Sequence, residues 1–317
     1  MRPFASFSSG AEQPRAPTVT DAAGARPPGM RLAVLGSPIA HSKSPALHAA
    51  AYSALGLDWN FRAVEVREGE TARFFETLDA SWRGLAVTMP LKREVMQHLD
   101  EIDAVAQRVG AVNTVLFDHG RRFGFNTDVY GVTRALGELG VTAPHRVVLI
   151  GAGATAASVV VAVAGMGARE LLVVARAPER AAAVLLLAES VGLTASVAGL
   201  SDAIDGRADV VISTLPGGTT LGDETINAFA PASFRTTTPL FDVTYGPAHS
   251  ELVNSWNAAG GTSANGLGML LYQAVQQVRV FTGGGPNAVL DDENAVIESM
   301  KSALDDAASG HTRSPAP

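Results

Sequence analysis

Short apolar runs alternate, from residue 31 onward, with segments whose apolar residues recur at helical spacing. Strands are predicted at residues 31–36, 60–66 and 84–88, and helices at 44–57, 68–80 and 90–99. The last of these helices has Pro90 in its first turn, where a missing N–H is tolerated. Residues 112–125 predict a β-hairpin that turns at Asp118–Gly120. Together these elements predict an α/β domain of about 100 residues.

A second set of elements begins near Gly131. Its strands are rich in Val, Ile and Leu and are predicted at residues 146–151, 170–175, 194–199, 208–214 and 239–245. Helices predicted at 151–167 and 178–192 separate them, which indicates parallel β-α-β units with helices on both faces of the sheet. The last strong helix, at 267–283, is expected to pack back on the first domain. The cleft between the two domains is then the expected ligand site.

The composition limits the classes of protein to consider. The chain has 317 residues, which suggests about two domains, and its 47% hydrophobic and 17% charged residues allow a large core. A net charge of -7 without a stripe of Lys and Arg argues against a nucleic-acid binder. The absence of cysteine excludes a disulfide framework, a thiolate metal site and a cysteine nucleophile, and we expect no metal site. It also fits a reducing compartment, so we expect a cytoplasmic protein.

Apolar and low-complexity segments add two expectations. No uninterrupted run of about 18 strongly apolar residues is present, so no membrane-spanning helix is expected. The apolar segment 154–167 is too short to span and instead predicts a helix buried between layers. Residues 1–29 are rich in Pro, Ala, Gly and Ser and lack the apolar core of a secretory signal. We expect residues 1–29 and 309–317 to be disordered tails.

A glycine-rich turn follows the first apolar strand of the second set and opens a helix. Its pattern is Gly151-x-Gly153-x-x-Ala156, the dinucleotide-binding signature in the position where it is meaningful. Gly151 allows the tight turn, Gly153 lets a pyrophosphate approach the backbone, and Ala156 lets the helix pack close to the strand. The free N–H groups of the helix start suit phosphates. A plain packing turn is the alternative, and the context favours a nucleotide-binding Rossmann domain.

Two arginines indicate which dinucleotide is bound. In NAD-binding domains an acidic residue ends the second strand and bonds the ribose 2′-hydroxyl. Here that strand ends in Ala175-Arg176-Ala177, Arg180 follows one turn later, and the first acid is Glu179. Guanidinium groups match a 2′-phosphate, so the sequence predicts NADP(H). The alternative is that both arginines simply belong to a solvated helix start.

Polar residues gather where strands of the first domain are predicted to end. They are Ser42 and Ser44, Thr88 with Lys92, Asn113 with Thr114, and Asn126 with Asp128. In open α/β sheets, ligands bind off the carboxyl ends of the strands. Each residue also has a structural explanation: helix caps for the serines and Asp128, turns for the asparagines, and a solvated helix position for Lys92.

Taken together, the motifs resemble those of the shikimate dehydrogenase family in order and spacing. The segments are GSPIAHSKSPALH, GLAVTMPLK, GAVNT, GFNTDVYG, GAGATA, FDVTYGP and GLGMLLYQA, and the resemblance covers residues 31–285. It implies an NADP-dependent oxidoreductase that reversibly reduces 3-dehydroshikimate to shikimate, in the pathway to aromatic amino acids. It also implies an α/β fold with a substrate domain, at 30–130 and 265–308 here, and a Rossmann domain at 131–264. The C-terminal helices would return to the first domain.

The resemblance also implies residue roles. Ser42 and Ser44 would bind the substrate carboxylate, and two hydroxyl donors beside a helix start are suited to that task. The other implied substrate contacts are Thr88, Asn113, Tyr245 and Gln273. The implied cofactor contacts are Gly151, Gly153, Ala154, Ala156, Arg176, Arg180, Thr214 and Gly266.

Lys92 and Asp128 are the implied catalytic pair. An ammonium near the substrate ketone would stabilise the negative charge that develops on its oxygen and could donate the proton. Asp128 would hold a hydroxyl or the ammonium in place. The sequence leaves open which of the two residues transfers the proton.

Several positions depart from the family pattern without removing a catalytic group. Alanine stands where the family often has asparagine or glycine, at Ala49, Ala86 and Ala154. Ala175 and Ala177 flank Arg176 where Asn-Arg-Thr is usual, and Ser213-Thr214-Leu215 replaces Asn-Ala-Thr. A quinate/shikimate or aminoshikimate dehydrogenase of the same family is an alternative, as is a non-catalytic NADPH-binding regulator or a scaffold protein. The expected partner is a small-molecule substrate, for a monomer or homodimer.

Overall fold

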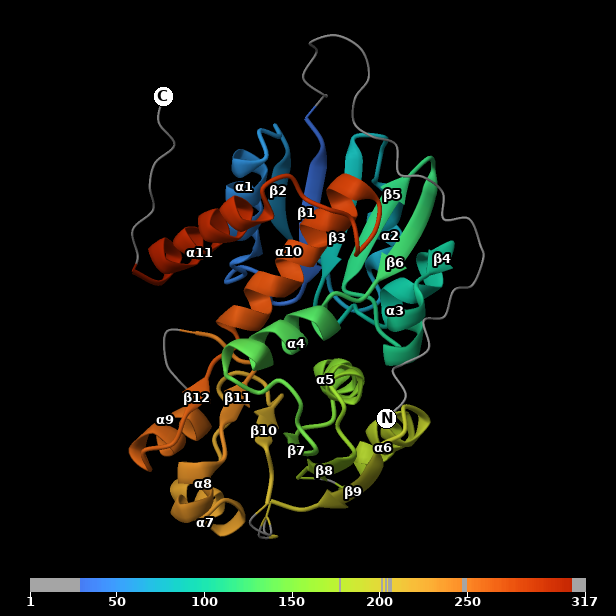
Figure 1. Ribbon diagram of the computed structural model, residues 1–317. Helices are drawn as coiled ribbons and strands as arrows, with labels where there is room; N and C mark the ends of the chain where they lie inside the picture. The colour runs from blue at the N-terminus through green and yellow to red at the C-terminus, as the bar shows by residue number, and fades with distance from the viewer. Residues whose placement is uncertain are drawn as a thin grey trace.

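The computed structural model describes residues 29–176, 178–200, 202, 204, 207–246 and 250–309. In these residues the chain forms two six-stranded sheets, each with its own helices (Figure 1). Apart from residues 29 and 309, the predicted disordered tails lie outside the described residues. In the described part, no helix is long and apolar enough to cross a membrane.

The first sheet has the strand order β2-β1-β3-β5-β6-β4. Its strands are β1 (Arg31–Gly36), β2 (Asn60–Glu65), β3 (Trp82–Val87), β4 (Glu101–Ile102), β5 (Thr114–Asp118) and β6 (Arg121–Phe125). The first three are parallel, and β5 is antiparallel to both β3 and β6. The predicted hairpin is therefore confirmed as β5–β6, and its turn places His119 and Gly120 at positive φ.

Helices cover both faces of this sheet because successive side chains of its strands point to opposite sides. Leu32 and Val34 face a core shared with helices near the C-terminus, whereas Ala33 and Leu35 face the other layer. The helices are α1 (Ser44–Ala54), α2 (Thr71–Glu76), α3 (Ala104–Val109), α10 (Leu267–Gly283) and α11 (Glu293–Ser309). The expectation that the helix at 267–283 returns to the first domain is confirmed.

The helix predicted at 90–99 is wrong in type. The chain forms a turn and then a short 3-10 helix, η1 (Glu94–His98). The carbonyl of Lys92 accepts a hydrogen bond from the N–H of Val112, and the N–H of Met96 donates to the carbonyl of Arg93. Because the carbonyl of Lys92 is bonded to Val112, the N–H of Met96 donates to the residue three positions back instead of four. This spacing is that of a 3-10 helix, whereas the apolar pattern predicted an α-helix.

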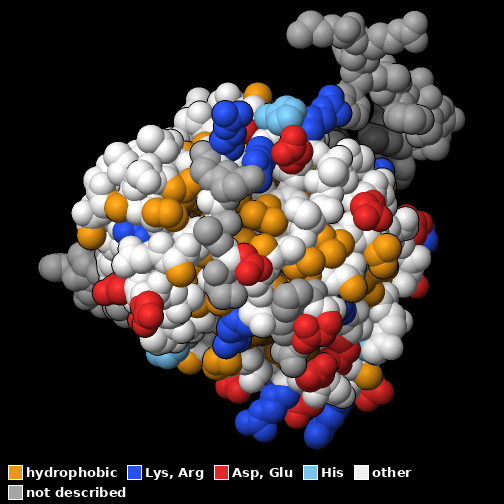
Figure 2. Space-filling view, turned by 90° about the horizontal axis from the view of Figure 1, so that it is seen from below, with side chains coloured by type: hydrophobic (Ala, Val, Ile, Leu, Met, Phe, Trp, Pro, Cys, Tyr) orange, Lys and Arg blue, Asp and Glu red, His pale blue; other side chains and the backbone are white. Residues whose placement is uncertain are grey.

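The second sheet is parallel throughout, with the order β12-β11-β10-β7-β8-β9. Its strands are β7 (Arg146–Ile150), β8 (Glu170–Val174), β9 (Thr194–Ala198), β10 (Val210–Ser213), β11 (Leu240–Asp242) and β12 (Ser263–Ala264). Its helices are α5 (Ala154–Gly165), α6 (Ala182–Ser190), α7 (Asp223–Phe229), α8 (Ala232–Thr237) and α9 (Glu251–Ala258), with the 3-10 helix η2 (Pro178–Ala181). Separate cores on its two faces confirm the predicted layers. On the end of the molecule seen in Figure 2, acidic and basic side chains both occur around a hydrophobic centre.

Helix α4 (Asp128–Glu138) connects the two sheets and crosses α10 at close range. The predicted domain boundary between residues 130 and 131 falls within it. A Cβ atom at Gly131 would lie 2.8 Å from the carbonyl oxygen of Met269 and 3.0 Å from the Cβ of Gln273. Glycine at this position therefore lets the start of α4 approach the helix that carries Gln273.

We expect Gly131→Ala to lower the free energy of unfolding by about 1–3 kcal/mol, because the added methyl group must push α4 and α10 apart. Gly137 in the same helix is the matched control, since a Cβ there meets no atom within 4 Å. Gly137→Ala should raise stability by roughly 0.5–1 kcal/mol through better helix propensity. Denaturant unfolding of both variants measures this, and a stabilising Gly131→Ala would refute the close crossing.

Candidate active site

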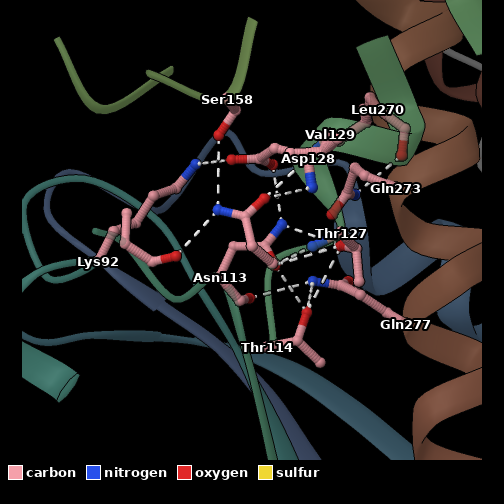
Figure 3. Close-up of polar contacts among 12 residues, drawn as sticks. Lys92, Asn113, Thr114, Thr127, Asp128, Val129, Ser158, Leu270, Gln273 and Gln277 are labelled. Carbon is pink, nitrogen blue, oxygen red and sulfur yellow. Dashed lines mark hydrogen bonds and ion pairs between the residues drawn. The ribbon is translucent and has the colours of Figure 1, made fainter. Parts of the chain in front are cut away.

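The candidate catalytic pair lies where β3 and β5 meet the start of α4. Lys92 Nζ donates to Asp128 Oδ2 at 2.6 Å, and the two side chains are only 14% and 6% exposed (Figure 3). Lys92 comes from the turn after β3, and Asp128 is the first residue of α4. The structure thus brings together an ammonium and a carboxylate 36 residues apart in the chain.

Two asparagines position Asp128, one through its carboxylate and one through its backbone. Asn113 Nδ2 donates to Asp128 Oδ1 at 2.8 Å and to Thr127 Oγ1 at 2.9 Å. Asn126 Oδ1 accepts from the backbone N–H of Asp128 at 3.1 Å. The start of α4 also favours a negative charge at this position. Because both N–H groups of the Asn113 side chain are used, a substrate contact from its amide nitrogen would have to replace one of these bonds.

The predicted carboxylate-binding serines lie on the loop after β1. Ser44 begins α1, and its backbone N–H donates to Ser42 Oγ at 3.3 Å. This loop is close to the end of β3, because a Cβ at Gly36 would lie 2.5 Å from Thr88 Cγ2. The structure therefore places Thr88 beside the end of β1, where the loop that leads to Ser42 and Ser44 begins.

The remaining predicted substrate residues approach from elsewhere. Gln273 lies on α10 near the start of α4, and its amide nitrogen donates to the carbonyl of Leu270 at 2.8 Å (Figure 3). Tyr245 follows β11 in the second domain and is 36% exposed. Among the described residues, neither side chain is hydrogen-bonded to Lys92 or Asp128.

The glycine-rich turn has the features that a dinucleotide needs. Gly151 has a φ of +107°, and a Cβ there would lie 2.5 Å from Thr214 Oγ1, so only glycine fits. A Cβ at Gly153 would instead project into open space, which leaves room for a phosphate. Gly153 caps α5 without a side-chain hydrogen bond, and the first N–H groups of that helix are available. The residues present therefore fit the pyrophosphate of a dinucleotide.

The other predicted cofactor residues lie on several segments of the chain. Ala156 is fully buried, as expected for close packing of α5, and Ala154 begins the helix. Arg176 is exposed just after β8, while the side chain of Arg180 lies outside the described residues. At Gly266, before α10, a Cβ would lie 2.0 Å from the carbonyl oxygen of Val243, so the chain requires glycine there.

A cavity of about 400 Å³ lies at the carboxyl ends of β10 and β11. Its lining includes Ser213, Asp242, Tyr245 and the loop 215–221. Asp242 is 1% exposed and accepts hydrogen bonds from the backbone and hydroxyl of Thr244 and from the Ser250 hydroxyl. This carboxylate therefore shapes the loop that carries Tyr245.

Known proteins resemble this chain in sequence. Residues 34–115 match the family model for the shikimate dehydrogenase substrate binding domain, and residues 134–245 match that for shikimate / quinate 5-dehydrogenase. A shikimate dehydrogenase (NADP(+)) from Methanothermobacter thermautotrophicus is 33% identical over 258 residues, which cover 80% of this chain and 91% of the relative. The chain belongs to the shikimate dehydrogenase family.

Solved structures of similar proteins share the fold. Shikimate 5-dehydrogenase from Thermus thermophilus, in complex with NADP(H) and shikimate, has a TM-score of 0.70 at 35% identity and covers 87% of this chain and 100% of its own. A ligand-free 5-ketofructose reductase from Gluconobacter has a TM-score of 0.71 at 26% identity, with 86% and 98% covered. The resemblance to the shikimate dehydrogenase family and the predicted α/β fold are confirmed, and a reductase named for a different ketone has the same fold.

This member of the shikimate dehydrogenase family buries a histidine that the sequence did not single out. His48 in α1 is 0% exposed, and its ring stacks on Phe61 with centroids 3.9 Å apart. Its Nδ1 lies 3.1 Å from the hydroxyl of Tyr52 and its Nε2 lies 3.1 Å from Gln277 Oε1. Gln277 was also missed, although it lies four residues after Gln273 and so on the same side of α10.

Burial lowers the pKa of His48 to about 4, and the hydrogen bond to Gln277 offsets only part of this. Burial likewise raises the pKa of Tyr52, so both side chains are neutral near pH 7. Because the unfolded chain binds a proton at His48 from about pH 6.5 downward, the folded state loses stability as the pH falls from there to about 4.

We expect the free energy of unfolding to fall by about 3 kcal/mol between pH 6.5 and pH 4 because of His48. Unfolding free energies of the wild type and of His48→Gln, measured across that range, test the expectation. The variant lacks the titrating group, so its stability should fall less steeply with decreasing pH, whatever its absolute value. Parallel curves for the two proteins would show that His48 does not carry the linkage.

Proposed function

We propose that the protein is an NADP-dependent oxidoreductase that reversibly reduces 3-dehydroshikimate to shikimate. The observation that carries the proposal is the buried Lys92–Asp128 pair, where the turn after β3 meets the start of α4. Asn126, which precedes Asp128 by two residues, lies 3.4 Å from Ser158 of α5, the helix that follows the glycine-rich turn. The names of the relatives support the substrate and the cofactor. We also assign residues 30–130 and 265–308 to the substrate domain and 131–264 to the NADP-binding domain.

Lys92 is the better candidate for the proton donor. Its ammonium has three hydrogens, one of which is donated to Asp128, so two remain for a substrate oxygen. The ionised carboxylate of Asp128 can only accept, and its two oxygens already receive Lys92 and Asn113. We therefore assign charge stabilisation and proton transfer to Lys92 Nζ, and orientation of that ammonium to Asp128.

The nicotinamide cofactor would supply the hydride when bound. Gly151, Gly153 and the start of α5 would hold its pyrophosphate, and Arg176 would meet a 2′-phosphate. Ser42 and Ser44 would hold the substrate carboxylate beside the start of α1. We further expect a cytoplasmic monomer or homodimer that acts on a small molecule.

The assay that tests the proposal follows absorbance at 340 nm. Shikimate with NADP should give the highest kcat/KM, ahead of quinate and aminoshikimate with NADP and of shikimate with NAD. The panel should include 5-ketofructose with NADPH, because a reductase of that name shares the fold. A higher kcat/KM with quinate, aminoshikimate or 5-ketofructose would show that the proposed substrate is wrong. Tight NADPH binding without turnover of any compound in the panel would instead indicate a non-catalytic NADPH-binding regulator.

Lys92→Met should lower kcat by about 10²–10⁴-fold, the range for loss of general acid–base catalysis, with a modest change in KM. Lys301→Met is the matched control, because this lysine pairs with Glu298 on the exposed side of α11. Initial rates with shikimate and NADP measure both variants. Turnover close to that of the wild type in Lys92→Met would remove this residue from the mechanism.

A further inference from the structure

We propose that Gln277 is a positioning residue that holds the Lys92–Asp128 pair in one arrangement, and that His48 fixes the orientation of its amide. The inference rests on the proposed function and extends it to a helix near the C-terminus. Gln277 is 1% exposed and lies 164 residues after Asn113, with which it is hydrogen-bonded.

The orientation of the Gln277 amide follows from its partners. Its nitrogen lies 3.2 Å from the backbone carbonyl oxygen of Asn113 and 3.1 Å from Thr114 Oγ1. A carbonyl oxygen can only accept, so this end of the amide must be the NH₂ group. Its oxygen is then the atom that faces His48 Nε2.

The tautomer of His48 follows in turn. Because Gln277 Oε1 can only accept, Nε2 of His48 carries the hydrogen, and Nδ1 is left to accept from the hydroxyl of Tyr52. The buried imidazole stays neutral, so it presents one donor and one acceptor. His48 and Tyr52 therefore hold the Gln277 amide in the orientation that its other partners require.

The direction of the hydrogen bonds continues to the catalytic pair. Thr114 Oγ1 receives from Gln277, so its own hydrogen goes to Asn113 Oδ1, 2.8 Å away. Asn113 Oδ1 also accepts from the backbone N–H of Thr127 at 2.8 Å, which turns its NH₂ group toward Asp128 Oδ1. Asp128 Oδ2 then accepts from Lys92. Figure 3 shows this network from Gln277 to Lys92.

Loss of Gln277 would free the hydroxyl of Thr114 to rotate away from Asn113 Oδ1. The oxygen of the Asn113 amide would then keep only the bonds from Thr127, and a flipped amide would place an oxygen against the carboxylate of Asp128. Lys92 would lose its fixed partner for part of the time. We expect the effect mainly on kcat, since the network ends at the Lys92–Asp128 pair and, apart from Asn113, contains no residue assigned to substrate binding.

Gln277→Leu tests the proposal against Gln276→Leu. The control removes a neighbouring buried glutamine of the same helix, whose amide nitrogen donates, within the described part of the chain, only to the carbonyl of Pro286 at 3.4 Å. We expect kcat with shikimate to fall about tenfold in Gln277→Leu, with KM within about twofold of the wild type. Gln276→Leu should keep its kcat. Equal kcat values in the two variants would overturn the proposal.

Thr114 provides a second test that does not depend on the folding of Gln277→Leu. Thr114→Val removes the hydroxyl at nearly constant volume and should lower kcat to a similar extent, whereas Thr114→Ser should restore it. In the double variant Gln277→Leu/Thr114→Val, kcat should not fall much below the lower single variant, because both changes break one network. Multiplicative losses, or equal rates for Thr114→Val and Thr114→Ser, would refute the shared role.

The tautomer of His48 gives a readout without turnover. Nitrogen-15 chemical shifts of the wild-type ring should report a hydrogen on Nε2, and a hydrogen on Nδ1 alone would overturn the assigned orientation of Gln277.

The outcomes of these experiments also separate this inference from the proposed function. A wild type that turns over no substrate of the panel defeats the proposed function and this inference with it, whereas an active wild type with an equally active Gln277→Leu defeats this inference alone.

Discussion

The carboxylate of Asp128 can lie in the interior because both of its oxygen atoms have partners. A charge removed from water costs on the order of several kcal/mol unless an opposite charge and hydrogen bonds replace the water. Lys92 and Asn113 supply these on Oδ2 and Oδ1. The groups come from the turn after β3, the start of β5 and the first turn of α4, so the edge of the sheet must be assembled before this carboxylate is buried.

The same segment that carries Asp128 also connects the two halves of the site. Asn126 orients the backbone at Asp128 and donates through its amide to Ser158 on α5. Next to it, the small side chains of Ala111 and Ala157 pack in one cluster, which lets the segment before β5 approach α5 closely. The helix that would bind the phosphates therefore contacts Asn126, the residue that orients the backbone at Asp128.

Local sequence patterns predicted the secondary structure and the turns that depend on neighbouring residues. The alternation of strands and helices, the hairpin turn at residues 118–120 and the glycine-rich turn follow from periodicity and backbone freedom. The polar residues at the strand ends indicated the candidate site. The 3-10 helix after Lys92 was not predictable, because a bond from Val112 decides it. Gln277 and His48 are 229 residues apart, and no pattern in one sequence reports such a contact.

The position of helix α10 late in the chain affects the order in which the two cores can form during synthesis. The core that covers one face of the first sheet contains Leu271, Val275 and Phe281 from α10 and Met300 from α11. These residues leave the ribosome after all of β7 to β12. Most of the core of the second sheet can therefore form before α10 and α11 have been made. One face of the first sheet, although its strands are made earlier, stays uncovered until these helices follow. The apolar surface that chaperones and proteases can reach during synthesis thus belongs to the half of the molecule that is synthesised first.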